Sequence, residues 1–168
     1  MLVTYYSFVV MRMRRETDDQ TRAINLNRML REMEERPEVV PRDRYMRMLN
    51  LPAGAVLIEV NEDYFVQTWA DGSGEVLDPA RVAADRDALQ KSVDRVQDVA
   101  NTSIAHRQQI EVRELTFGEV DQGFDALEGC LSKYYTLLHG ATLIGLEPAP
   151  QFDTHEVYTF PWLTRNGR

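Results

Sequence analysis

The chain has little of the chemistry that would tie it to an oxidising compartment or to a membrane. Its 168 residues include one cysteine, Cys130, which cannot form an internal disulfide and fits a reducing cytoplasm. No apolar run approaches the roughly 20 residues that span a bilayer, so no membrane is expected as a partner. The N-terminal LVTYYSFVVM has no basic residue before it and no small-residue cleavage site after it, unlike a secretion signal. We therefore expect a cytoplasmic protein.

Motifs for metals and cofactors are also missing. The sequence contains three histidines but no HExxH or CxxC pair, and His139 and His155 are not spaced as ligands with Cys130. The GSG at 72–74 lacks the lysine and the helix start that follow a phosphate-binding loop. We expect neither a metal nor a cofactor, and we expect Cys130 to pack as a small apolar residue.

Lysine is scarce, and charge is unevenly distributed along the chain. The net charge is −8, which argues against general affinity for nucleic acid. Residues 1–50, however, carry ten arginines against eight acidic residues, a net of +2. Arginine is well suited to bidentate phosphate contacts. Two interpretations remain open: a local basic face on the first helices, or a solvated surface of alternating charges, which such runs more commonly form.

Helical periodicity dominates the first fifty residues. Apolar side chains recur at positions 2, 5, 6, 9 and 13, which predicts a helix over Leu2–Arg15, although YYSFVV alone could be a strand. Thr17 and Asp18 are predicted to cap a second segment whose apolar face runs up to Pro37. The two segments could form one kinked helix or a helix pair. Pro41 is expected to be the first residue of a short helix that reaches Leu49.

Residues 51–77 are the least determined part of the pattern. AVLIEV and YFVQTW around NED could form a hairpin. NEDYFVQTWA could instead be a helix capped by Asn61, with Tyr64, Phe65, Thr68 and Trp69 on its buried side. We favour the helix, as a short or irregular connection, followed by a surface loop at ADGSGE.

Two long helices are predicted in the second half. Asp78 followed by Pro79 is typical of a helix start, and apolar residues recur from Val82 as far as Ile104, which predicts a helix over 79–108. Thr116 and Glu119 form a capping box for the second helix, and Gly140 is its expected end. The segment 141–168 is rich in proline and aromatic residues and is expected to pack as an extended strap anchored by Trp162. The sequence therefore predicts one all-α domain over 1–168, an antiparallel bundle of about five helices.

His106 is the main candidate for chemistry. It stands in NTSIAHR, near the expected end of the 79–108 helix, where a partly cationic imidazole is also favoured by the helix dipole alone. Arg107 is adjacent in sequence but points about 100° away on a helix. Arg95 points in nearly the same direction around the helix axis as His106. It lies some 16 Å away along that axis, however, which is too far for contact within one helix.

The order of motifs resembles a known family. RRETDD at 14–19 precedes INLNRMLREM. After these come, in order, LDPARVAADRDALQ, NTSIAHR, a helix ending in KYYTLLHG and the tail YTFPWL. This order is similar to that of HEPN-like helical domains of the abortive-infection type. The resemblance implies a homodimeric helical bundle of bacterial defence or toxin–antitoxin systems, with RNA and a cognate antitoxin or defence protein as partners.

Active members of that family cut RNA without a metal, using an arginine and a histidine with four to six residues between them. The resemblance implies that His106 acts as general acid or base and that an arginine stabilises the phosphate. Here Asn101, Ala100 and Val99 occupy the arginine positions. Asn101 could hydrogen-bond a phosphate or a 2′-hydroxyl. The charge could come from Arg107, or from an arginine on the first helices of a partner subunit.

Two functional hypotheses follow from these residues. In the first, the protein binds or cleaves RNA with His106, Asn101 and Arg107, while Arg14, Arg15 and Arg95 contact substrate phosphates. In the second, it is a non-catalytic interaction or adaptor protein of the same ancestry, which the missing arginine and the acidic pI of about 4.9 favour.

Overall fold

The fold is all-α, as the periodicity predicts. The computed structural model describes residues 2–18, 24–101 and 115–141, and the side chains of α1 from Phe8 onward. These residues form six α-helices, a short 3-10 helix and no strand. The elements are α1 (Leu2–Thr17), α2 (Leu26–Glu35), η1 (Pro37–Val39), α3 (Arg42–Leu49), α4 (Val56–Thr68), α5 (Pro79–Val99) and α6 (Phe117–His139). The expected strap lies outside the described residues, apart from Ala141.

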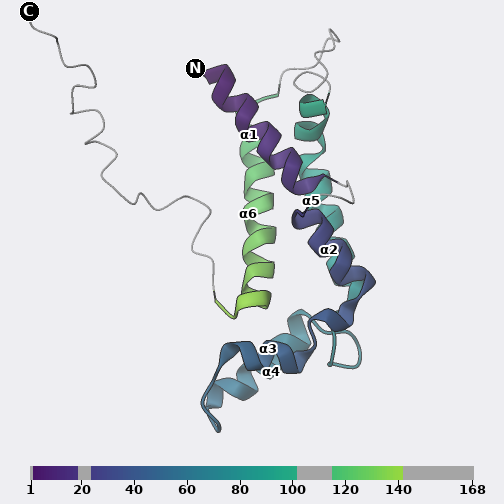
Figure 1. Cartoon of the computed structure of the whole chain (residues 1–168), viewed down its shortest axis with the longest axis vertical. Helices are drawn as coiled ribbons and strands as arrows, with labels where there is room; N and C mark the ends of the chain where they lie inside the picture. Colours follow the sequence, from purple (N-terminus) through teal and green to yellow (C-terminus); the bar gives the residue numbers. More distant parts are fainter. Residues whose placement is uncertain (1, 19–23, 102–114, 142–168) are drawn as a thin grey trace, which may run out of the picture.

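Helix α5 is the centre of the bundle. It packs against α1, α2 and α6, and α6 runs antiparallel to it (Figure 1). The α3–α4 hairpin lies at one end of the bundle, where α3 contacts the C-terminal part of α6. None of the described helices is both long enough and apolar enough to cross a membrane.

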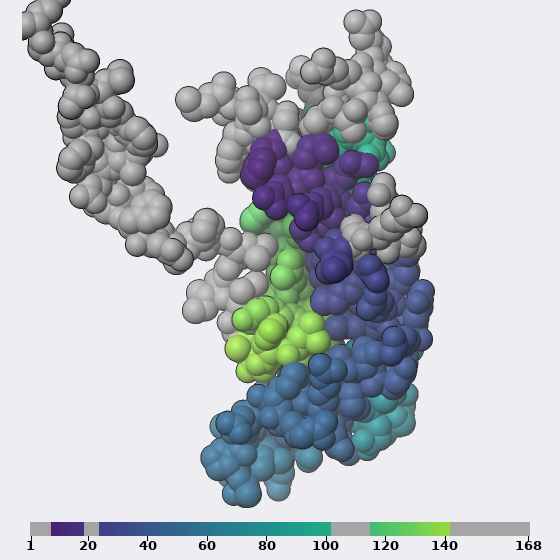
Figure 2. Space-filling view, in the orientation of Figure 1, coloured from purple at the N-terminus to yellow at the C-terminus, as the bar shows by residue number. Residues whose placement is uncertain are grey.

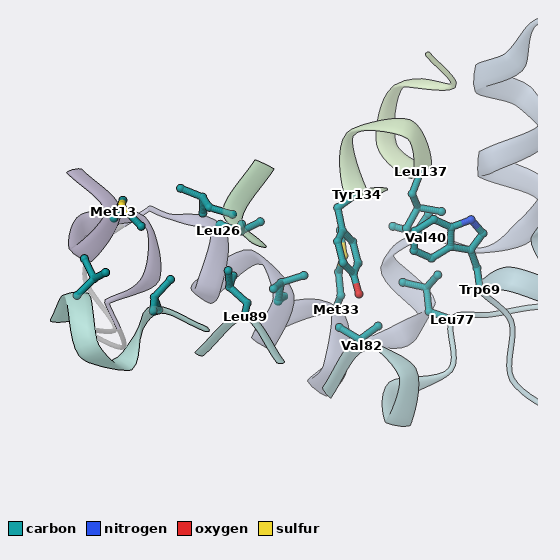
Figure 3. Packing of buried hydrophobic residues seen from close by; sticks show 14 of the residues in the cluster. Met13, Leu26, Met33, Val40, Trp69, Leu77, Val82, Leu89, Tyr134 and Leu137 are labelled. Carbon is teal, nitrogen blue, oxygen red and sulfur yellow. The ribbon is translucent and has the colours of Figure 1, made fainter. Parts of the chain in front are cut away.

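One hydrophobic core runs through both parts of the molecule. Met13, Leu26 and Leu89 lie in the bundle, and the core continues past Tyr134 to Trp69 (Figure 3). The ring centroids of Trp69 and Tyr134 are 5.5 Å apart in an edge-on arrangement, which joins the end of α4 to α6. The hairpin is therefore attached to the bundle by burial of its aromatic residues.

The predicted helix caps of the second half are confirmed. The Asp78 carboxylate accepts a hydrogen bond from the backbone N–H of Ala80, at 2.9 Å. At the start of α6, the Thr116 hydroxyl accepts a hydrogen bond from the backbone N–H of Glu119, and the Glu119 carboxylate accepts one from the backbone N–H of Thr116. Gly140 ends α6 in the left-handed conformation, with φ of 64°. These interactions are local, so the sequence alone specifies them.

The predicted caps of the first half are wrong. Asn25 caps α2, because its side chain accepts from the backbone N–H of Arg28, while Thr17 is the last residue of α1. The two segments are separate helices rather than one kinked helix. Helix α3 begins at Arg42, one residue later than predicted, and Pro41 is its N-cap rather than its first residue.

The helix favoured over the hairpin for 51–77 is present, with different bounds. It begins at Val56, so Asn61 is an interior residue whose amide donates to the carbonyl of Leu57 at 2.7 Å. Phe65 and Trp69 are buried as predicted, but Tyr64 is 44% exposed. The loop that follows is closed by an antiparallel bridge between Ala70 and Leu77.

Candidate functional site

A polar hollow lies where α1 ends beside α2 and α5. It has a volume of about 290 Å³, and we call it the polar pocket. Two arginines, four side-chain amides, a carboxylate and a hydroxyl line it: Arg14, Arg86, Asn27, Gln90, Gln97, Asn101, Asp18 and Thr17. Nearly every lining group can form hydrogen bonds, so the pocket is suited to a polar ligand.

Asn25 fixes the junction of α1 and α2 beside this pocket. Its side-chain amide donates to the backbone carbonyls of Arg15, at 3.0 Å, and of Asp18, at 2.9 Å. Because its oxygen also caps α2, one buried side chain satisfies groups on both helices. The end of α1 is thereby held in place next to α5.

A relay of amides connects α5 to α1 across the pocket. The side-chain amide of Gln90 donates to the side-chain oxygen of Gln97, at 2.7 Å. Gln97 donates in turn to the hydroxyl of Thr17, also at 2.7 Å. The buried Thr17 hydroxyl donates its own proton to the carbonyl of Met13, at 2.8 Å. Satisfied networks of this kind hold their members in one arrangement.

The two arginines of the pocket are held differently. The Nε of Arg86 is 2.9 Å from a carboxylate oxygen of Glu34, which is a direct hydrogen bond. Arg14 is 4.0 Å from the Asp18 carboxylate, beyond hydrogen-bonding distance. The Arg14 guanidinium therefore keeps donors that an incoming anion can use, whereas one donor of Arg86 is occupied by Glu34.

Asn101 lies at the end of α5, where the helix widens. Ala100 and Asn101 form a π-helical turn directly after Val99. Such turns are frequent at functional sites, because they reorient side chains relative to the α-helix before them. Asn101 thus lines the same pocket as Arg14, although 87 positions separate them in sequence.

A second hollow adjoins the polar pocket on the outer side of α1. It measures about 380 Å³, and Arg14 and Asp18 line both hollows. Arg12 and Arg15 are exposed there, and the Arg12 guanidinium lies 5.2 Å from the ring centroid of Phe8. We call Arg12, Arg14 and Arg15 the α1 basic face.

The structure separates the candidate residues of the sequence into groups. Arg14 and Asn101 share the polar pocket, and Arg15 lies in the adjoining hollow. Arg95 lies instead near α6, where it pairs with Glu119 at 3.9 Å. His106 and Arg107 lie outside the described residues.

A polar cluster between α5 and α6 was not expected from the sequence. Asp85 accepts hydrogen bonds from Lys133 and from the hydroxyl of Tyr134, the latter at 2.9 Å. Burial and the charge of Asp85 raise the pKa of the Tyr134 hydroxyl, which keeps it protonated as a donor. The Lys133 ammonium also lies 5.3 Å from the Trp69 ring centroid. With its charges paired, this cluster joins helices rather than forming a reactive site.

Sequence reasoning missed most of the pocket because its members come from three helices. Gln90 and Gln97, two helical turns apart on one face of α5, were the available signal. Within the described residues, no cluster of three or more His, Cys, Asp or Glu side chains is placed to hold a metal. In comparisons with known proteins, no family model, curated protein or solved structure matches the chain.

Proposed function

We propose that the protein binds RNA, with a backbone phosphate in the polar pocket and neighbouring phosphates along the α1 basic face. The convergence of Arg14 and Asn101 in one pocket carries this proposal. The HEPN-like resemblance calls for an arginine near Asn101, and α1 of the same chain supplies one. No arginine from a second subunit is then needed at this position.

The groups in the pocket suit the chemistry of a phosphodiester. Arg14 neutralises charge and donates to two phosphate oxygens, while the Asn101 amide donates to a third oxygen or to the 2′-hydroxyl. His106 follows Asn101 by five residues and is the proposed general acid or base of metal-independent cleavage. In that reaction the ribose 2′-oxygen bonds to phosphorus, the bond to the 5′-oxygen breaks, and the 2′-hydroxyl proton is lost as the leaving oxygen gains one.

Binding is tested with the full-length protein and a fluorescent single-stranded RNA. Arg14→Ala is expected to weaken binding by about 10- to 100-fold, the usual worth of a hydrogen bond to a charged group. Arg36→Ala is the matched control, because Arg36 is highly exposed and pairs with Glu38 at 3.7 Å, outside the pocket. Equal losses of RNA affinity in the two variants would show that the polar pocket is not the binding site.

Cleavage is tested separately, in EDTA, with the wild type and a folded His106→Ala variant. Loss of cleavage in the variant supports a metal-independent ribonuclease. Binding without cleavage by the wild type supports an RNA-binding protein that is not a nuclease. Absence of both binding and cleavage supports the second candidate, a non-catalytic interaction protein. The net charge of −8 favours that candidate, because most of the surface repels nucleic acid.

A further inference from the structure

Helix α4 carries an apolar surface that no described residue covers. Val56 is 78% exposed, Leu57 56%, Val60 55% and Tyr64 44%. These four residues, which we call the α4 outer face, follow one side of the helix because they recur at three- and four-residue spacing. Phe65 is the buried residue of α4 and fixes which side faces the protein.

One edge of this surface is acidic. Glu59 and Asp63 lie one turn apart on α4, both are exposed, and neither forms an ion pair with another described residue. The sequence of α4 contains no basic residue. Two α4 helices packed face to face would bring these carboxylates together, so a cationic and apolar partner fits better than a second copy.

The described part of the chain ends at α3, the helix that packs on α4. Gly140 lies against α3, because a Cβ built on it would be 2.9 Å from Leu49 Cδ2. Helix α3 packs in turn on α4, so the chain after Ala141 starts at the hairpin that forms one end of the molecule (Figures 1 and 2).

The sequence of the segment after Ala141 is complementary to the α4 outer face. It ends in FPWLTRNGR, which places Phe160, Trp162 and Leu163 directly before Arg165 and Arg168. The chain between Ala141 and Phe160 can extend to about 65 Å, whereas the 13 residues of α4 are about 20 Å long. The connecting length therefore allows contact within one chain.

We propose that residues 160–168 bind the α4 outer face of the same chain. Phe160, Trp162 and Leu163 cover Val56, Leu57, Val60 and Tyr64. Arg165 and Arg168 pair with Glu59 and Asp63. The contact covers an apolar helix face that the described residues leave exposed.

Hydrogen exchange of the full-length protein, measured peptide by peptide, tests this contact. Trp162→Ala is expected to speed exchange of the α4 amides at least tenfold and to leave α5 unchanged. Arg165→Glu with Arg168→Glu is expected to act in the same direction. Adding Glu59→Arg and Asp63→Arg to that variant is expected to restore protection, which a general loss of stability would not allow.

Phe117→Ser is the matched control, since Phe117 is 69% exposed at the start of α6. It is expected to leave α4 exchange unchanged. Equal α4 exchange in the wild type and both tail variants would overturn the proposal. Protection of α4 that rises with protein concentration would also overturn it, because the occupant would then be a second copy.

Discussion

At the residue scale, Arg14 is held more loosely than the arginines that form close ion pairs on α2 and α3. Arg42 approaches Glu75 to 2.7 Å and Arg28 approaches Glu32 to 3.0 Å. Arg14 has Asp18 at 4.0 Å, and its side chain is 26% exposed at the mouth of the polar pocket. A guanidinium that is weakly paired and partly shielded from water loses few existing interactions when it binds an anion.

Arg14→Lys should separate the role of charge from that of geometry. Lysine keeps the positive charge but cannot form two parallel hydrogen bonds to one phosphate. We expect RNA affinity between those of the wild type and Arg14→Ala, measured by fluorescence anisotropy. Wild-type affinity in Arg14→Lys would mean that only the net charge of the site matters.

Cys130 is expected to react slowly in the folded protein. Burial, followed by the charge of Asp85, raises the pKa of its thiol to about 11. At pH 8.5 the thiolate is then roughly 100-fold scarcer than in an unfolded chain, so alkylation by iodoacetamide should slow by about that factor. The raised pKa also means that native stability falls as the pH rises from about 9 towards 11, where the unfolded thiol ionises first.

The alkylation rates are measured with and without urea, using mass spectrometry to follow the single thiol. Equal rates in the two states would contradict the partial burial of Cys130 between α5 and α6.

At the element scale, a glycine inside α6 and the glycine that ends it should respond to alanine in opposite ways. Gly129 is exposed in the middle of α6, and nothing packed against the helix lies within 4 Å of the position that an added methyl group would take. Gly129→Ala should therefore stabilise the folded protein by about 0.5–1 kcal/mol. Gly140 has φ of +64° and lies against Leu49, so Gly140→Ala should destabilise by about 1–2 kcal/mol. Urea denaturation of both variants measures the difference, and a common sign would refute the assigned end of α6.

Local interactions explain which elements could be predicted from the sequence. Asp78 and the Thr116–Glu119 box bond to backbone groups within three residues, so their patterns suffice. Asn61 carries an equally good cap pattern, yet it lies inside α4. The helix starts earlier, at Val56, because the apolar residues before Asn61 continue the same helix.

The polar pocket depends on tertiary contacts and so could not be predicted. Thr17 resembles a helix cap in sequence, but its hydroxyl bonds back to Met13 and accepts from Gln97, 80 residues away. The sequence indicates Asn101 by its position before His106, whereas its proximity to Arg14 depends on how α1 packs against α5.

At the scale of the whole molecule, a small basic face lies on an acidic protein. If Arg12, Arg14 and Arg15 each contact one phosphate, the logarithm of RNA affinity should fall with the logarithm of salt concentration with a slope of about −2. A titration between low and physiological salt measures this slope. A slope near zero would show that the α1 basic face does not bind the backbone.

The relay from Gln97 to Thr17 also has a consequence for the order in which the chain is made. The two residues are 80 positions apart, so α1 leaves the ribosome roughly 4 to 16 s before its partner at typical synthesis rates. During that interval Val10 and Met13 have no α5 to cover them, although both are buried in the finished fold. Newly made N-terminal helices are thus a natural substrate for chaperones that shield apolar segments until synthesis reaches α5.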